Sequence, residues 1–189
     1  TDAVMPVDVI GISSAIAVTS GNGFSCALLQ GGRVQCWGEN SSYQLGNGSP
    51  TSSSTPKDVS TNKVFAAISA GSAHVCGVLT SGSYACWGNN GSGQQGDLTT
   101  SVNGTPYTGT NLVTNAIAVT SGSSHTCVLL ATNEVKCWGA NQSGQLGLGY
   151  ASTMVTSPAL VPNLTNATGV AAGGAHTCAR ITIGQALCW

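Results

Sequence analysis

The chain has 189 residues, enough for one or two ordinary domains, and its formal net charge at pH 7 is −1. Only 6% of the residues are charged, and this balance provides no long-range field that would attract nucleic acid or an anionic membrane. Hydrophobic residues make up 41% of the chain and recur in register, which argues against disorder, and no apolar run approaches the roughly 18 residues of a membrane span.

The first segment, residues 1–14, is predicted to be the outer strand of a preceding structural unit. Pro6 stands nine residues before Ala15, where a short β-prone run begins. Pro56 and Pro158 stand at the same distance before two later runs of the same kind. The segment therefore matches the end of a repeated unit.

From Ala15 onward the chain repeats with a period of 50 to 51 residues. Four tryptophans mark this period: Trp37, Trp87, Trp138 and Trp189. The period predicts the units 15–64, 65–115 and 116–166, followed by an incomplete unit at 167–189. Each unit opens with a β-prone run that ends at glycine, such as "AIAVTSG" at 15–21. A period of this length is typical of propeller blades or solenoid turns within one domain.

Each unit continues with two strands that each carry a cysteine. Cys26 and Cys36 are symmetric about Gly31, which predicts a three-residue hairpin loop ending at Gly32. Such loops usually end in a left-handed residue, which Gly or Asn adopts most readily. Opposite cysteines at a non-hydrogen-bonded site have Cα atoms about 4.5 Å apart, within the range that a disulfide accepts. The other units give the pairs Cys76 with Cys86, Cys127 with Cys137, and Cys178 with Cys188. The pattern predicts one disulfide in each unit and an oxidising compartment.

Metal binding is the alternative interpretation of these cysteines. His74, His125 and His176 each precede a cysteine by two residues. Structural zinc sites usually take cysteines from short loops such as C-x2-C, whereas these lie on facing strands. Phe24 holds the histidine position in the first unit without disturbing the frame. We therefore predict partly buried histidines bonded to neighbouring backbone groups, with no metal and no other cofactor.

After each of the first three tryptophans the chain continues as "WGENSSYQLGNG", "WGNNGSGQQGDL" and "WGANQSGQLGLG", with the shared frame W-G-x-N-x-x-x-Q-x-G. Together with the H-x-C-A/V-L strand, this frame resembles the RCC1-type repeat, whose blades build β-propellers. The resemblance covers essentially the whole chain, which is similar to a secreted, cysteine-paired bacterial branch. It implies an all-β fold of four-stranded blades with loops on the two faces of a disc. The nucleotide-exchange and chromatin roles of the family's namesake do not follow, because the charged surface for them is missing.

RCC1-type propellers generally have more blades than this chain has units, so an arc of four would expose apolar faces and strand edges. Three completions remain open: the chain is a fragment of a longer propeller, other copies supply the missing strands, or the four units close a small ring. In the second case the segment 1–14 of one copy completes the last blade of the next, head to tail.

These completions lead to two hypotheses of function. The first is an extracellular structural protein that self-assembles into a filament or surface layer by strand complementation between subunits. The alternative is a secreted protein-binding or inhibitor propeller of which this chain is a fragment. The expected partners are further copies of the chain or another secreted protein, with no nucleic acid and no membrane insertion. The expected location is extracellular or on the cell surface.

No catalytic arrangement is visible, and we expect no enzyme activity. The six acidic residues are scattered over different units, without a recurring pair spaced for acid–base chemistry. No nucleophile elbow, phosphate-binding glycine loop or zinc-protease motif occurs.

The Asn- and Ser-rich loops carry N-x-S/T sequons in two groups. Asn40, Asn90 and Asn141 share one unit position, where we expect bonds to the backbone. Candidate glycosylation sites lie in the variable loops: Asn47, Asn103, Asn163 and Asn166. Binding specificity is expected in the same loops, with three exposed aromatic candidates: Tyr43, Tyr107 and Tyr150.

Overall fold

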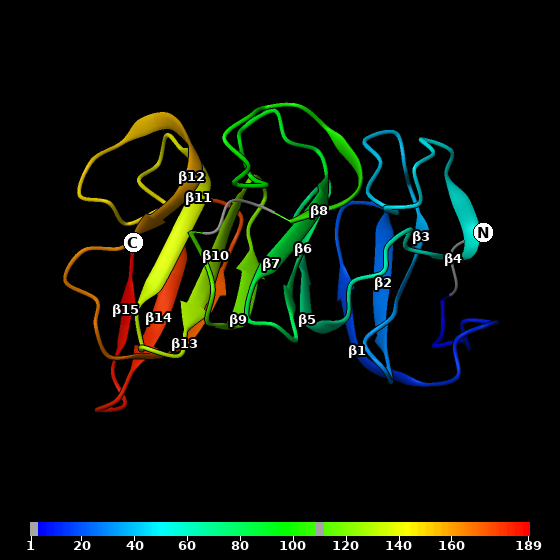
Figure 1. The fold of residues 1–189 in the computed structure, drawn as a ribbon, viewed down its shortest axis with the longest axis horizontal. Helices are drawn as coiled ribbons and strands as arrows, with labels where there is room; N and C mark the ends of the chain where they lie inside the picture. The colour runs from blue at the N-terminus through cyan, green and yellow to red at the C-terminus, as the bar shows by residue number, and fades with distance from the viewer. Residues whose placement is uncertain (1–3, 109–111) are drawn as a thin grey trace.

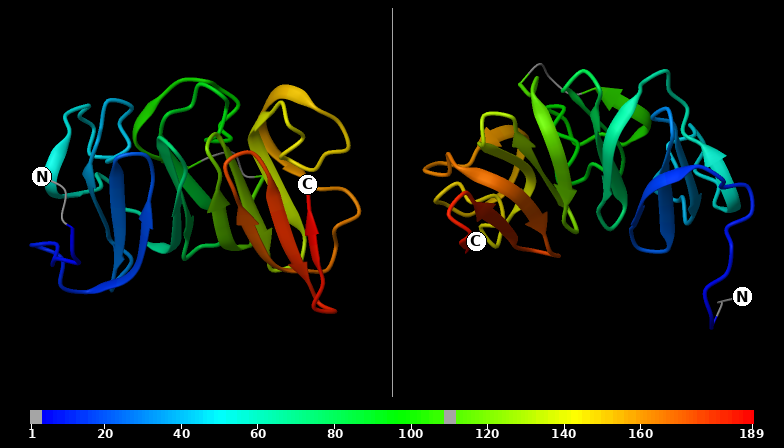
Figure 2. Two further views of the ribbon diagram at one scale, coloured as in Figure 1. Left: turned by 180° about the vertical axis from the view of Figure 1, so that it is seen from behind. Right: turned by 90° about the horizontal axis from the view of Figure 1, so that it is seen from below.

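The computed structural model describes residues 4–108 and 112–189. These residues form fifteen β-strands joined by turns and loops, and none of them forms a helix. The strands form four antiparallel sheets, three of them with four strands and the last with three. Figure 1 shows the sheets side by side as blades, with the two chain ends at opposite ends of the row. Seen from below, the row curves (Figure 2, right). The predicted all-β, partial-propeller architecture is confirmed.

Each blade runs from an inner strand outward in chain order. The first blade contains β1 (Ala15–Ser20), β2 (Phe24–Leu29), β3 (Val34–Gly38) and β4 (Ser53–Asp58). The second contains β5 (Phe65–Ala70), β6 (His74–Leu79), β7 (Tyr84–Gly88) and β8 (Asn103–Thr108). The third contains β9 (Ala116–Ser121), β10 (His125–Leu130), β11 (Val135–Asn141) and β12 (Ser152–Leu160). The fourth contains β13 (Ala167–Ala172), β14 (Thr177–Ile181) and β15 (Ala186–Cys188).

The cysteine hairpins have the predicted register. In the first blade Cys26 lies directly opposite Cys36, and the Leu29 amide donates to the Arg33 carbonyl at 2.8 Å. Gly32 closes the loop with a φ of 79°. The corresponding residues of the other hairpins also have positive φ: Gly82, Asn133 and Gly184. The three-residue loop with a left-handed last residue is therefore confirmed in all four hairpins.

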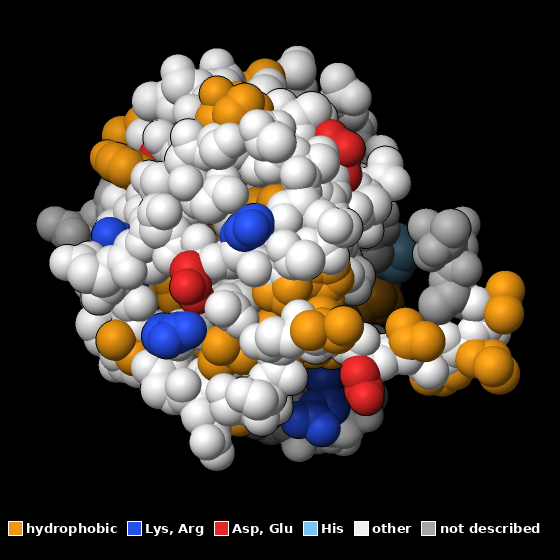
Figure 3. All heavy atoms as spheres, turned by 90° about the vertical axis from the view of Figure 1, so that its right-hand side faces the viewer, with side chains coloured by type: hydrophobic (Ala, Val, Ile, Leu, Met, Phe, Trp, Pro, Cys, Tyr) orange, Lys and Arg blue, Asp and Glu red, His pale blue; other side chains and the backbone are white. Residues whose placement is uncertain are grey.

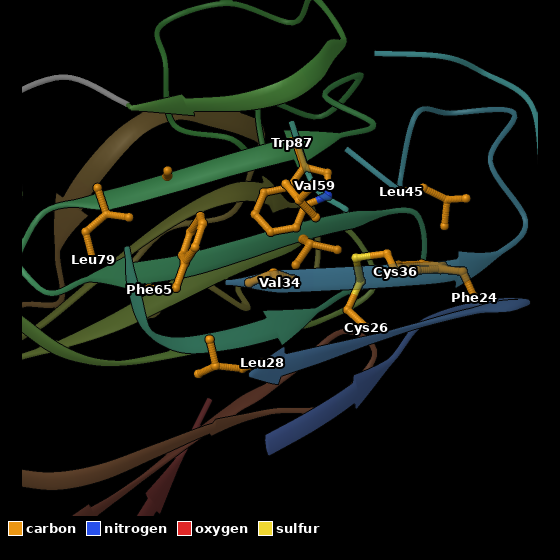
Figure 4. Packing of buried hydrophobic residues seen from close by; sticks show 12 residues of the cluster. Phe24, Cys26, Leu28, Val34, Cys36, Leu45, Val59, Phe65, Leu79 and Trp87 are labelled. Atoms are coloured by element: carbon orange, nitrogen blue, oxygen red, sulfur yellow. A yellow bond between two sulfur atoms is a disulfide. The ribbon is translucent and has the colours of Figure 1, made fainter. Parts of the chain in front are cut away.

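A hydrophobic cluster fills each space between neighbouring blades. Between the first and second blades it joins the Cys26–Cys36 disulfide and Leu28 to residues of the next sheet (Figure 4). Phe65 and Trp87 of that next sheet meet edge to face with ring centroids 5.7 Å apart. Because both faces of the second and third blades are covered, β6 and β10 are buried along their whole length.

The turns that follow the inner strands lie next to one another and are joined by backbone hydrogen bonds. The amide of Asn22 donates to Ser72 O, that of Ser72 to Ser123 O, and that of Ser123 to Gly174 O. These turns line an open hollow of about 310 Å³ on the concave side of the row. The lining consists of small side chains and glycines, so the hollow offers backbone groups and few functional side chains.

Residues 4–14 form no strand, which differs from the outer strand expected over 1–14; residues 1–3 lie outside the described part. In the complete blades the outer strand pairs with the strand that carries the second cysteine. Within the described residues no such edge lies beside 4–14. The segment instead exposes apolar side chains, with Val4, Met5, Val7 and Ile10 between 71% and 97% accessible. None of the described residues forms a helix that is long and apolar enough to cross a membrane.

Candidate functional site

A chain of hydrogen bonds crosses the junction between the second and third blades. Thr126 Oγ1 lies 2.9 Å from the carbonyl oxygen of Gln94 and donates to it. A hydroxyl has one proton, so the same oxygen accepts from His74 Nε2, 3.0 Å away. Trp138 Nε1 donates to the same Gln94 carbonyl at 2.8 Å. His74, Thr126 and Trp138 have no accessible surface, so this network lies in a dry interior where each bond is hard to replace.

The junction between the third and fourth blades repeats this network. His125 Nε2 donates to Thr177 Oγ1 at 2.9 Å, and Thr177 Oγ1 donates to the Gln145 carbonyl at 2.8 Å. Trp189 Nε1 reaches that carbonyl at 3.0 Å. The same network therefore joins the second blade to the third and the third blade to the fourth.

The junction between the first and second blades keeps one bond and replaces the others. Trp87 Nε1 donates to the Gln44 carbonyl at 2.9 Å. Phe24 stands at the histidine position and Val75 at the threonine position, and both belong to the hydrophobic cluster of this junction. Both partners thus change together: histidine is paired with threonine, and phenylalanine with valine.

Both junction histidines are neutral at physiological pH. Burial lowers the pKa of His74 to about 3, with a smaller effect from the charge of His125. Burial likewise lowers the pKa of His125 to about 4, with a smaller effect from His176. Nδ1 of His74 and of His125 is buried without a hydrogen-bond partner, as an unprotonated acceptor. The expected bond from these histidines to a neighbouring backbone group is wrong, because Nε2 binds a threonine hydroxyl of the next blade.

The two ends of the row expose parts that the internal junctions bury. At the first end Trp37 and Ser25 are half-buried, and Val18 is 73% exposed. Figure 3 shows this end, with patches of hydrophobic side chains and with the N-terminal segment standing out from the body. At the other end His176 is exposed, and its ring has no hydrogen-bond partner among the described residues.

All four predicted disulfides are present, with Cα separations of 4.0 to 4.1 Å. The cysteines of the first three blades have no accessible surface. In the last blade Cys178 is half-buried and Cys188 is exposed, because this hairpin faces outward at the end of the row. Among residues 4–108 and 112–189, no three His, Cys, Asp or Glu side chains lie close enough together to hold a metal ion.

The repeated asparagine closes the loop after each of the first three tryptophans. Asn40 Oδ1 accepts from the Leu45 amide at 2.9 Å, and its Nδ2 donates to the Thr51 carbonyl at 2.9 Å. Asn90 and Asn141 make the equivalent bonds and are likewise fully buried. The expected backbone-bonding role of these three residues is confirmed.

The four glycosylation candidates differ in how free their side chains are. Asn103 Nδ2 donates to Gln95 Oε1 at 2.6 Å and to Asp97 Oδ2 at 2.9 Å, and Asn47 Oδ1 accepts from a backbone amide. Asn166 is half-buried. Asn163 is exposed at the tip of a turn, with a φ of 60°. Modification of these residues stays a prediction, and Asn163 is the most accessible acceptor of the four.

The three tyrosines do not form one surface. Tyr107 is 51% exposed and Tyr150 is 58% exposed. Tyr43 is half-buried, and a Cβ built on Gly104 of the second blade would lie 2.8 Å from its ring, so it packs between two blades. The expectation that Tyr43 is exposed is therefore wrong, whereas a binding role for the other two stays a prediction.

The fold and its junctions define a β-propeller of repeated, disulfide-closed blades. Two family models, both described as regulator of chromosome condensation (RCC1) repeat, match the chain. One matches residues 15–44, 65–94 and 116–145, and the other matches 31–78 and 134–180, which is half of the chain. The chain belongs to the RCC1 repeat family.

Several of the known proteins that it resembles are longer. Rat HERC4, a probable E3 ubiquitin-protein ligase, is 40% identical over 75 residues, which are 39% of this chain and 7% of that protein. The structure of human WBSCR16 has a TM-score of 0.86 at 20% identity, over 95% of this chain and 48% of that one. The CRINKLY WD40 ectodomain of the Arabidopsis thaliana receptor kinase ACR4 has a TM-score of 0.62 at 24% identity, over 93% and 55% of the two chains. The chain thus spans about half the length of these two solved structures and a small part of HERC4.

Proposed function

We propose that this chain is an extracellular structural protein that assembles head to tail, with the first blade of one copy against the fourth blade of the next. The observation that carries the proposal is the state of the two ends. The internal junctions bury a histidine or phenylalanine ring and a disulfide, and two of them also bury a tryptophan, whereas at the ends His176 and Cys188 are exposed and Trp37 is half-buried. Association of the two ends would bury these parts against each other, with a hydrophobic and polar contact between neighbouring blades as at the internal junctions.

Strand complementation extends this contact. In the three complete blades an outer strand covers the edge of the strand with the second cysteine. In the fourth blade β15 has no such neighbour within the described residues, and all its residues are exposed. The mostly apolar segment 4–10 of the next copy, whose one charged residue is Asp8, could pair along this edge, as an extended segment does in β-augmentation. Pairing would cover both an open edge and an exposed apolar segment.

The extracellular location rests on two supports. Four disulfides in a chain of this size fit an oxidising environment far better than a reducing one. The same fold also occurs in the ectodomain of a plant receptor kinase. No part of the proposal uses an enzymatic activity.

Electron microscopy of the oxidised native protein tests the proposal. We expect filaments or closed rings made of stacked blades, and isolated curved particles at all concentrations would refute it. Replacing Val7 by Asp puts a second charge next to Asp8 in the complementing segment and removes an exposed apolar side chain, and it should reduce assembly. The matched control is Leu98→Asp, which changes a 62% exposed leucine on an outer loop of the second blade and should leave assembly unchanged.

A second candidate function is favoured by the exposed aromatic rings of Tyr107 and Tyr150. Tyrosine is enriched among the residues that contribute most to protein interfaces, and both rings lie on outer segments that differ between units. In this case a secreted protein should copurify with the wild type and be lost from the double variant Tyr107→Ala/Tyr150→Ala, with assembly unaffected.

A further inference from the structure

We infer that His176 of one copy and Ser25 of the next form the hydrogen bond that sets the register of the assembly. This inference rests on the proposed head-to-tail association and adds the pair of residues that recognise each other.

The ring at the histidine position always matches the residue before the first cysteine of the next blade. His74 faces Thr126 and His125 faces Thr177, each pair within 3.0 Å. Where the ring is Phe24, the next blade offers Val75. The exposed ring of the fourth blade is His176, and so it requires a hydroxyl. The first blade has Ser25 at the facing position, so the two ends of this chain satisfy the rule with each other.

Ser25 is also free to act as the acceptor. Ser25 is half-buried as a residue, and its hydroxyl lies 3.2 Å from Ser20 Oγ at an exposed position. When Ser25 donates to Ser20, its oxygen accepts from His176 Nε2, just as Thr126 accepts from a histidine while donating to a carbonyl.

A second pair of substitutions agrees with the same docking. Leu28 and Ala85 share the cluster of the first junction. On the outer face of the fourth blade Arg180 stands at the leucine position, and on the outer face of the first blade Gln35 stands at the alanine position. Gln35 Oε1 is buried without a hydrogen-bond partner, and the guanidinium of Arg180 uses two of its five donors on Thr168. At the two ends polar side chains thus replace the leucine and the alanine together, which favours a second copy of this chain as the occupant.

A double-mutant cycle on the full oxidised chain tests the inference. His176→Phe leaves Ser25 facing an apolar ring, and Ser25→Val leaves His176 facing a methyl group. Each single variant should weaken self-association, measured by sedimentation equilibrium, by roughly tenfold, or about 1.4 kcal/mol. The double variant His176→Phe/Ser25→Val recreates the pair of the first junction and should recover most of the loss. Because both residues lie on the outer faces of the first and last blades, the circular dichroism spectrum and the stability of the monomer should not change.

The outcomes separate the pairing of His176 with Ser25 from the assembly on which it depends. If the wild type associates and the single variants associate equally well, the pairing is wrong, although head-to-tail assembly stands. The pairing is also wrong if the double variant is as weak as the sum of the singles. If the wild type stays monomeric at the highest attainable concentration, both the assembly and the pairing are overturned.

Discussion

Replacing Thr126 by Val should destabilise the folded chain by about 2 kcal/mol. The two side chains have nearly the same shape, so the change removes a hydroxyl without opening a cavity. It leaves His74 Nε2–H, which has no access to water, without its acceptor, and it removes one of the two donors to the Gln94 carbonyl. An orphaned buried donor costs about 1 to 3 kcal/mol.

Replacing the partner residue, His74, provides an internal control for this prediction. His74→Phe alone should cost about 1 kcal/mol, because Thr126 keeps its bond to Gln94 and loses one donor. A Cβ built on Gly71 lies 2.2 Å from Cε1 of His74, and one built on Gly21 lies 2.1 Å from Cε1 of Phe24, so the two rings occupy equivalent sites and a phenylalanine fits. The double variant His74→Phe/Thr126→Val should therefore lie within about 1 kcal/mol of the wild type, because the polar pair is removed together.

Guanidinium unfolding under oxidising conditions, followed by tryptophan fluorescence, measures these differences. Thr153→Val on the exposed side of β12 serves as the matched control and should be neutral. The explanation is refuted if Thr126→Val is as stable as the control, or if the double variant is less stable than either single variant.

Three further predictions concern pH, reduction and modification. Since the folded pKa values of His74 and His125, about 3 and about 4, lie below the unfolded value of 6.5, stability should be complete above pH 6.5 and fall as the pH drops below it. The loss approaches about 1.4 kcal/mol per pH unit for each histidine, and a variant with both junctions converted to Phe/Val should lose this dependence in pH-resolved unfolding curves. When the dilute native protein is mildly reduced with a thiol and the freed cysteines are alkylated, mass spectrometry should find Cys178 and Cys188 labelled first, since the other six cysteines have no accessible surface. Equal labelling of all four pairs would contradict the structure. Secretion from a host that attaches N-glycans should modify Asn163 ahead of Asn103, and glycopeptide mapping with the reverse order would show that the bonded side chain is more available than its contacts indicate.

The hairpins could be predicted from the sequence because their information is local. Cys26, Gly32 and Cys36 lie within a few residues of one another, so the loop length sets the register and the register sets the disulfide. The same count holds in every unit, and four repetitions of one pattern leave little freedom for another arrangement.

The junction network could not be predicted in this way because its partners come from different blades. Thr126 lies 52 residues from His74, and its role depends on which face of the next blade it occupies. The clue in the sequence is the paired change of Phe24 and Val75 against the His and Thr of later units, which has meaning only once neighbouring blades are known to touch. The segment 4–14 shows the same limit, since its strand character depends on a partner edge that lies beyond its own blade.

Sedimentation velocity of the oxidised full chain across a concentration series tests head-to-tail assembly most directly. The proposed contact between the first and fourth blades predicts species that grow with concentration for the wild type and shift towards the monomer for His176→Phe. A single monomeric boundary for the wild type at every concentration would contradict it.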